Sequence, residues 1–272
     1  MNNKVKVSLG LLLLLVFACA KNPFTGKSTL ALVPNSEILP SAFQQYDQFL
    51  SENKVVKGTA DAKRIETVGM KIKTAAERWL NANGQADYLK NYKWEYNLVQ
   101  DDAVNAWCMP GGKIVFYTGI LPICKDDTGI ATVMGHEVSH ALANHGQQRM
   151  SAGILQQLGA AGVGVATGGK SEATQQIAMT AYGATTQYAG MLPFSRSHES
   201  EADKIGLTLM AIAGYNPDTA VAFWERMSAN SGGQAPPEFM STHPSDQTRI
   251  ANIKSLIPAA KAEAAKFGVT FK

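Results

Sequence analysis

The chain has 272 residues, of which 45% are hydrophobic and 17% are charged, so it carries enough apolar sequence for one sizeable core or two small ones. These proportions are typical of a globular protein and exclude a bundle of membrane helices. The formal charge is +3, or +1 without the two lysines of the first 18 residues, and no long acidic or basic run is present. Nucleic acid is therefore not predicted as a partner.

The N-terminus has the pattern of an export signal. Lys4 and Lys6 precede a mostly apolar stretch over residues 7–20, which at 14 residues is too short to cross a bilayer comfortably. Within it, "VFAC" resembles the bacterial lipobox, which implies cleavage before Cys19 and a lipid on its sulfur. An ordinary signal peptide or a short uncleaved anchor is the alternative. We expect a lipoprotein signal peptide over residues 1–18 and membrane attachment through the lipid.

The two remaining cysteines depend on this prediction. After export, Cys108 and Cys124 would lie in an oxidising compartment, where a disulfide is permitted. Nothing in their spacing indicates that the side chains meet, so buried free thiols are favoured over a bridge. A cysteine nucleophile is the least favoured interpretation.

The segments before residue 121 predict a tether, helices and a small sheet. Residues 19–40 mix prolines, a glycine and polar residues, which is typical of a tether between lipid and domain. A helix is expected from Ser41, and residues 61–82 place apolar side chains at helical spacing behind Asp61 as a cap. From Tyr92 the period becomes two, and "NAWCMPGGKIVFYTG" predicts two short strands around a turn, hence a small antiparallel sheet.

After Leu121 the pattern is helical almost to the end. Helices are expected near residues 127–145, 147–166, 171–190, 197–213, 217–229 and 246–264. The uncharged stretch between Arg149 and Lys170 holds glutamines and many small residues, so we expect a buried or site-covering helical segment and not a membrane span. The predicted fold class is α+β, mainly α, in one domain over residues 41–272.

The stretch "GHEVSH" contains the pattern H-E-x-x-H. On a helix, His136 and His140 project from one face and can bind one ion at about 2.0–2.1 Å each. Residues 126–128 offer a helix start and Gly146 a stop. Glu137 lies about 100° around the helix, where it can take a proton from water that zinc has acidified. Chance produces this pattern in such a chain less than about one time in a hundred.

A catalytic zinc ion needs a third protein ligand. A metzincin would place glycine and histidine where this chain has Ala143 and Gly146, so that class is excluded. The sequence "FSRSHESEADKIG" contains Glu199 and Asp203, one helical turn apart. Glu199 can therefore bind zinc while Asp203 orients a ligand imidazole.

Three polar residues near these motifs receive no site role. His145 is interpreted as a cation near a helix C-terminus, where it interacts with the helix dipole. His198 adjoins Glu199 but is rotated by about 100°, so it is not expected to be a ligand. Glu201 is expected to be solvated or salt-bridged.

Four motifs together carry a resemblance to a known family. "NAWCMPGGKIVFYTGIL", "GHEVSH", "FSRSHESEADKIG" and "STHPSDQTRI" resemble, in this order, the zinc metallopeptidase family that holds the CAAX prenyl protease, HtpX and BepA. The resemblance runs from about residue 30 to 256. It implies a zincin-like (gluzincin) fold and one zinc ion bound by His136, His140 and Glu199. It also implies Glu137 as catalytic base and endopeptidase action on proteins.

The same resemblance suggests roles for two further parts of the chain. An edge strand of the "PGG" hairpin could pair with an extended substrate, with Asn105 to Met109 and Ile114 to Phe116 flanking the cleft; an ordinary hairpin is the alternative. His243 could stabilise the oxyanion or occupy zinc's fourth position as a removable plug, or it could be a packed structural histidine. Arg249 is expected to support His243.

The predicted protein is an exported, lipid-anchored zinc endopeptidase of the bacterial cell envelope. Its layout is closest to the small outer-membrane lipoproteins of the family, and Ala20 after the cysteine favours the outer membrane facing the periplasm. The expected substrates are proteins or peptides, in particular misfolded or misassembled ones. The alternative is a binding or chaperone-like lipoprotein whose zinc site is structural or self-blocked. The oligomeric state is not predicted.

Overall fold

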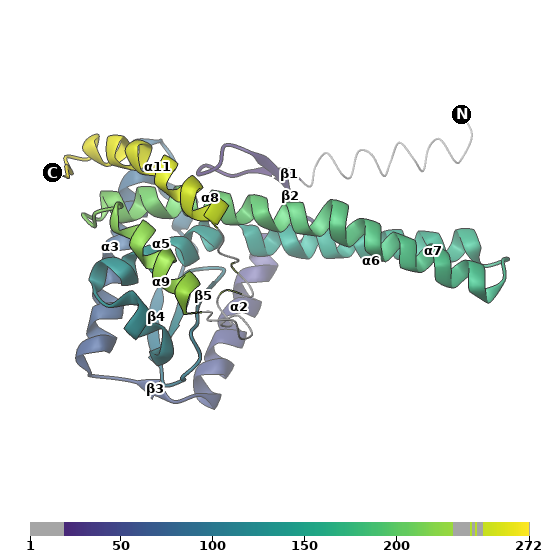
Figure 1. Ribbon diagram of the computed structural model, residues 1–272, viewed down its shortest axis with the longest axis horizontal. Coiled ribbons are helices and arrows are strands. Elements are labelled where there is room, and N and C mark those ends of the chain that lie inside the picture. Colours follow the sequence, from purple (N-terminus) through teal and green to yellow (C-terminus); the bar gives the residue numbers. More distant parts are fainter. Residues whose placement is uncertain (1–18, 231–239, 241–242, 244–246, 272) are drawn as a thin grey trace.

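The computed structural model describes residues 19–230, 240, 243 and 247–271, shown in Figure 1. The predicted signal peptide over residues 1–18 lies outside the described residues. The described part is mainly helical with a small sheet, as the sequence predicted. Its shorter helical elements are η1 (Ala86–Leu89), η2 (Thr118–Ile120), α4 (Leu121–Cys124) and the π-helical η3 (Thr186–Met191).

Helix α5 (Asp127–Leu142) is the centre of the fold. Every residue from Gly129 to Leu142 is buried, as in a helix that is surrounded on all sides. Helix α3 (Ala60–Ala82) buries its predicted apolar stripe against α5, and α8 (Leu192–Ile212) packs along α5 over a long contact. Helices α9 (Thr219–Ala229) and α11 (Gln247–Ala265) complete the core, α9 on α5 and α11 on α8.

The sheet has four strands in the order β3-β4-β6-β5, with β3 (Val55–Val56), β4 (Glu95–Val99), β6 (Lys113–Tyr117) and β5 (Ala106–Met109). The β5–β6 hairpin is antiparallel as predicted, but β4 and β6 are parallel. The predicted small sheet is therefore present, but it is mixed and not antiparallel throughout. Alternation identifies strands but not their neighbours, and here β6 inserts between β4 and β5.

The turn of the β5–β6 hairpin requires glycine. Gly111 and Gly112 have φ angles of 86° and 82°, which side chains with a Cβ atom rarely adopt. A Cβ atom on Gly112 would also lie 2.6 Å from the Trp94 ring. All five residues of β6 are buried, whereas β5 lies at the edge of the described sheet.

Residues 19–40 are structured, in contrast to the expected tether. They form a hairpin of β1 (Cys19–Lys21) and β2 (Ser28–Leu30), and helix α2 (Asn35–Glu52) begins six residues before Ser41. The side chain of Asn22 accepts hydrogen bonds within the hairpin turn and donates one of 2.7 Å to the carbonyl of Leu142, at the end of α5. The hairpin is therefore held against the helix that carries the H-E-x-x-H pattern.

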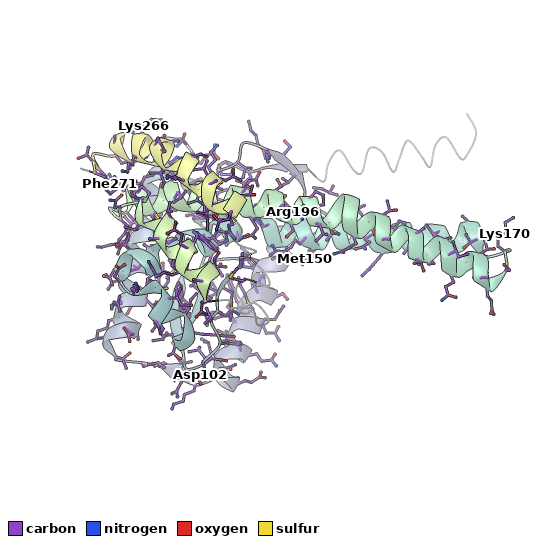
Figure 2. All side chains as sticks on the ribbon, in the orientation of Figure 1. Asp102, Met150, Lys170, Arg196, Lys266 and Phe271 are labelled. Atoms are coloured by element: carbon purple, nitrogen blue, oxygen red, sulfur yellow. The ribbon has the colours of Figure 1, made fainter. Side chains whose placement is uncertain are left out.

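Helices α6 (His145–Thr167) and α7 (Glu172–Thr185) form a hairpin that projects from the domain (Figure 1). Figure 2 shows its exposed side chains between Met150 near the base and Lys170 at the tip. The prediction of a buried or site-covering segment is wrong beyond Ser151, because α6 packs mainly on α7, which has no buried residue among those described.

The α6–α7 hairpin carries most of the exposed large hydrophobic residues in the described part of the chain. Seven of the eight large hydrophobic residues that are exposed in the described chain belong to it: Met150, Ile154, Leu155, Leu158, Val165, Ile177 and Met179. Among the described helices, none combines the length and the apolar content needed to cross a membrane.

Candidate metal centre

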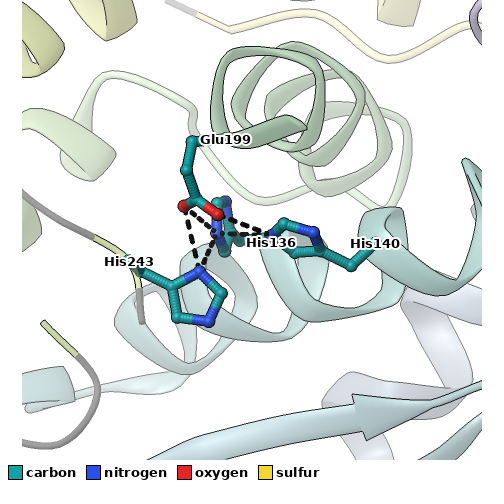
Figure 3. A group of neighbouring side chains, drawn as sticks. All are labelled: His136, His140, Glu199 and His243. Atoms are coloured by element: carbon teal, nitrogen blue, oxygen red, sulfur yellow. Dashed lines mark hydrogen bonds and ion pairs between the residues drawn. The ribbon is translucent and has the colours of Figure 1, made fainter. Parts of the chain in front are cut away.

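Helices α5 and α8 bring together the three residues predicted as metal ligands, as Figure 3 shows. On α5, the Nε2 atoms of His136 and His140 lie 3.1 Å apart. Glu199 on α8 places Oε2 3.2 Å from His136 Nε2 and Oε1 3.4 Å from His140 Nε2. All three residues are buried. A carboxylate from a later helix therefore faces the same point as the two imidazoles.

Helix α5 begins where the sequence indicated but ends earlier. The side chain of Asp126 caps it by accepting hydrogen bonds from the N–H groups of Thr128 and Gly129. The helix stops at Leu142 and not at Gly146, because Asn144 adopts a left-handed conformation with a φ angle of 57°. Asparagine tolerates this conformation better than most residues.

Two glycines allow the close approach of α5 and α8. A Cβ atom built on Gly135 would lie 2.8 Å from the carbonyl oxygen of Gly206, and one built on Gly206 would lie 2.9 Å from the His136 nitrogen. Real Cβ atoms do not approach backbone atoms this closely. Our sequence interpretation missed the pair, although a glycine directly before His136 and another two turns after Glu199 are a detectable signal.

His243 joins the same cluster. Its Nδ1 atom lies 3.1 Å from His136 Nε2 and 2.9 Å from Glu199 Oε2. One ligand atom from each of His136, His140, Glu199 and His243 lies within 4.8 Å of the others. The plug or oxyanion role foreseen for His243 is thus geometrically possible.

Glu137 is buried beside this cluster but is not part of it. Its side chain faces His243, with Oε1 3.4 Å from His243 Nε2. Within the described residues, Oε1 accepts no hydrogen bond of normal geometry. Burial raises the pKa of Glu137 above its ordinary value, which moves it toward the range of a general base.

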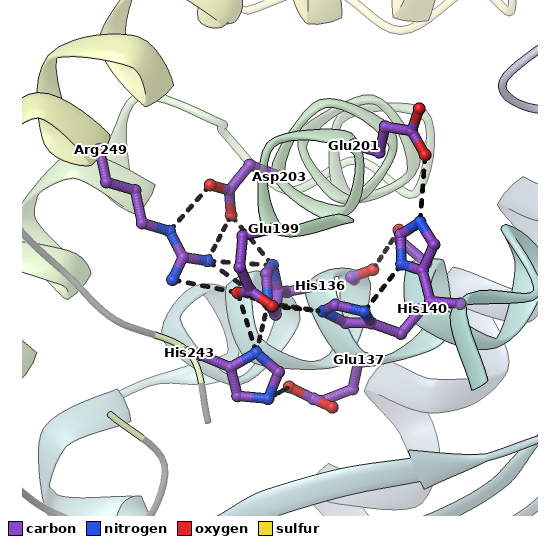
Figure 4. Close-up of polar contacts among 11 residues, drawn as sticks. His136, Glu137, His140, Glu199, Glu201, Asp203, His243 and Arg249 are labelled. Atoms are coloured by element: carbon purple, nitrogen blue, oxygen red, sulfur yellow. Dashed lines mark hydrogen bonds and ion pairs between the residues drawn. The ribbon is translucent and has the colours of Figure 1, made fainter. Parts of the chain in front are cut away.

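Asp203 and Arg249 hold His136 from behind (Figure 4). Asp203 Oδ1 lies 2.9 Å from His136 Nδ1, so this nitrogen keeps its proton and Nε2 is the atom that would bind a metal. Arg249 donates to both Asp203 oxygens at 2.8 and 2.7 Å. Its guanidinium also lies 3.3 Å from Glu199 Oε2, so Arg249 supports the two carboxylates.

Trp224 is a residue of the site that the sequence did not reveal. The Arg249 guanidinium lies 3.8 Å from the centre of its ring, and the His136 ring meets it edge to face at 5.7 Å. The tryptophan is buried in α9, where its spacing only indicated a core position. It fixes the guanidinium plane that binds Asp203.

The electrostatics of the cluster favour a positive charge at its centre. Burial opposes ionisation of Glu199, but hydrogen bonds with His136 and His243 hold its pKa well below the usual range. Burial likewise opposes protonation of His136, but its bonds with Asp203 and Glu199 raise the pKa to about 9. Imidazole nitrogens and a carboxylate around one buried point match the donor set of zinc. The residues therefore fit a zinc ion.

The three polar residues without a predicted role behave differently from one another. His145 is buried at the start of α6, and burial lowers its pKa to about 3, so its interpretation as a cation near a helix C-terminus is wrong. Glu201 is salt-bridged as expected, to Lys27, and accepts a hydrogen bond from His145. His198 points at Gln148, with its Nε2 atom 3.2 Å from the amide oxygen, and lies outside the ligand cluster.

The two strands of the predicted hairpin take different places in the sheet. Strand β5, which contains Cys108, lies at the sheet edge beside α5, whereas Ile114 to Phe116 belong to the interior strand β6.

Cys108 and Cys124 are free, Cys108 half-buried and Cys124 buried. The interpretation as free thiols is confirmed.

A mainly helical domain with a small mixed sheet, an H-E-x-x-H helix and an acidic ligand from a later helix defines a zincin-like metallopeptidase domain. Sequence comparison gives the family: the sequence profile of Peptidase family M48 matches residues 69–257 of this chain. The chain belongs to Peptidase family M48.

Relatives with established names come from mitochondria and from bacteria. Mitochondrial metalloendopeptidase OMA1 of Saccharomyces cerevisiae is 36% identical over 204 residues, which is 72% of this chain and 56% of the relative. Metalloendopeptidase OMA1 of Homo sapiens is 28% identical over 95% of this chain and 51% of the relative. The beta-barrel assembly-enhancing protease of Escherichia coli is 28% identical over 60% and 34%. The chain spans about half the length of the OMA1 relatives.

Proposed function

We propose that this protein is a zinc-dependent endopeptidase that hydrolyses peptide bonds of protein substrates. The observation that carries the proposal is the buried convergence of His136, His140 and Glu199, with Glu137 beside them. A purely structural zinc site has no need of a neighbouring base, whereas hydrolysis does. The names of the OMA1 relatives and of the beta-barrel assembly-enhancing protease agree with this reaction class.

Each residue has a distinct part in the proposed reaction. His136, His140 and Glu199 hold the zinc ion, which when bound polarises the scissile carbonyl and acidifies water. Glu137 accepts a proton from the attacking water at its carboxylate and then delivers it to the leaving amine. The raised pKa of Glu137 suits the first transfer, because a stronger base takes the proton from water more readily.

Strand β5 is proposed to bind the substrate backbone. It is the edge strand next to α5, so its outer N–H and C=O groups can pair with an extended peptide. Such pairing recognises the backbone and not particular side chains, which suits a protease that acts on misfolded or misassembled proteins.

His243 is proposed to be a removable plug of the zinc site. Its Nδ1 atom lies as close to His136 and Glu199 as the other candidate ligands lie to one another, which is the placement of a fourth ligand. In this conformation His243 fills the fourth position of the zinc site, which a substrate needs. A second candidate function, a self-blocked binding or chaperone-like protein, rests on the same observation and requires that His243 never leaves.

Metal analysis and cleavage of an unfolded protein such as casein test the proposal. Wild type and Glu137→Gln should each contain one zinc ion per chain, and only wild type should cleave. Glu66→Gln, which changes an exposed glutamate on α3, is the matched control and should cleave like wild type. Equal turnover by Glu137→Gln and wild type would remove Glu137 from the mechanism. The absence of cleavage by both wild type and His243→Ala would favour the second candidate function.

We further propose that the protein is a lipoprotein of the bacterial cell envelope, anchored through Cys19 to the outer membrane and facing the periplasm. The signal pattern and the Escherichia coli relative support this location, whereas the OMA1 relatives are named as mitochondrial. The apolar α6–α7 hairpin adjoins β2, next to the strand that contains Cys19. Labelling with an alkynyl fatty acid should mark wild type and Cys108→Ser but not Cys19→Ser.

A further inference from the structure

His140 has a buried partner on the side away from the ligand cluster. Its Nδ1 atom lies 2.8 Å from His145 Nδ1, and His145 Nε2 lies 3.1 Å from Glu201 Oε2. Figure 4 labels His140 and Glu201, the two ends of this series of contacts. The three residues come from α5, the start of α6 and α8. The side chain of His145 is fully buried, and that of Glu201 is 17% exposed.

The residues at the two ends of this series of contacts, His140 and Glu201, determine which nitrogen donates each hydrogen bond. His140 turns Nε2 toward Glu199, so this nitrogen keeps its lone pair for a metal and the proton lies on Nδ1. That proton is donated to His145 Nδ1, so His145 carries its own proton on Nε2 and donates it to Glu201. Glu201, an acceptor, fixes the tautomer of both rings.

The contact between His140 and His145 depends on the backbone conformation between them. In a continuous helix, His145 would lie about 140° around the axis from His140, too far to meet it. The left-handed Asn144 ends α5 and turns the chain, which brings the His145 ring back to His140. The ring is then stacked on His198, with centroids 4.0 Å apart and planes inclined by 10°. His198 in turn is held by Gln148.

We propose that His145 and Glu201 are positioning residues for the zinc ligand His140, an inference that rests on the proposed function. Helix α8 then supports both imidazole ligands: Asp203 holds His136 directly, and Glu201 holds His140 through His145. Carboxylates that orient a metal-bound imidazole commonly change metal affinity about 10–100-fold when they are lost.

Zinc affinity, measured by competition with a chromophoric chelator, tests the proposal. All variants, and the reference protein that is called wild type in these comparisons, carry Glu137→Gln, so that self-cleavage does not interfere. His145→Phe keeps the ring stack but loses both hydrogen bonds, and should weaken zinc binding about 10–100-fold. Glu201→Ala should weaken it about tenfold, and Glu201→Gln, whose amide oxygen still accepts from His145, should restore most of the loss.

Two controls separate positioning from packing. His198→Phe changes an equally buried histidine that does not bond to His140 and keeps the stack, so zinc affinity should stay within about twofold of wild type. Lys27→Met removes the salt bridge on the outer side of Glu201 and should be equally silent. A merely structural role of His145 would lower the melting temperature of both histidine variants without a selective loss of zinc.

The outcomes distinguish this inference from the proposed function. If wild type binds no zinc, the proposed function fails. If wild type binds zinc and folded His145→Phe binds it equally well, the positioning role is overturned. If His145→Phe does not fold, the partly exposed Glu201 decides: equal affinities of Glu201→Ala and wild type overturn the role, and a loss that Glu201→Gln restores supports it.

Discussion

The contact between α5 and α8 depends on two glycines, and Gly206→Ala is the change that tests its importance. The new methyl group would lie 2.9 Å from the carbonyl carbon of Gly135 and from the His136 nitrogen. Carbon atoms in ordinary contact lie about 3.5–4.0 Å apart. The two helices must therefore separate by about 0.6–1 Å, because neither neighbour is a flexible side chain.

This separation has two measurable consequences. Overpacking of a core contact costs about 1–3 kcal/mol, and a protein of this size loses about 2–4 °C of melting temperature per kcal/mol. Metal sites tolerate errors of only about 0.2 Å in ligand distance, so moving Glu199 away from His136 by several times that amount should weaken zinc binding strongly. We expect Gly206→Ala to lose both stability and zinc, measured by thermal unfolding and chelator competition.

Gly162→Ala is the matched control. Gly162 lies in the exposed interior of α6, where a Cβ atom would meet nothing within 4 Å. Alanine is favoured over glycine in helices by about 1 kcal/mol, so this variant should be slightly more stable than wild type and should bind zinc normally. A Gly206→Ala variant with the same melting temperature and zinc affinity as wild type would refute this reasoning.

Three further predictions concern the site and the core. His243→Ala should raise kcat/KM for unfolded protein by roughly tenfold, or about 1.4 kcal/mol, by opening the fourth position; a fall would indicate that His243 stabilises the oxyanion. Arg249→Lys should lower the free energy of unfolding in urea by about 2 kcal/mol, because lysine cannot bind Asp203 with two hydrogen bonds; an unchanged value would contradict that contact. Burial raises the pKa of Cys124 to about 12, so iodoacetamide at pH 8 should modify it only as the protein unfolds; rapid modification of folded protein would contradict its burial.

The sequence predicted those parts of the site that follow from helical spacing. His136 and His140 lie one turn apart in a helix capped by Asp126, and Glu199 with Asp203 repeats this spacing on a later helix. Because residues i and i+4 always share a helix face, these pairs need no knowledge of the fold. The sequence also indicated amphipathic α3 and the β5–β6 hairpin.

Features that depend on a single backbone angle or on neighbours in space could not be predicted this way. The left-handed Asn144 turns His145 from a surface position into a partner of His140. The parallel pairing of β4 with β6 and the stacking of Arg249 on Trp224 join segments that are distant in sequence. Local periodicity carries no information about such contacts.

A crystal structure with anomalous scattering recorded at the zinc absorption edge tests the central claim most directly. The account predicts one strong peak, about 2.0–2.2 Å from the Nε2 atoms of His136 and His140 and from a carboxylate oxygen of Glu199. A zinc ion bound elsewhere, or a Glu199 side chain out of reach of the ion that the two histidines hold, would contradict it.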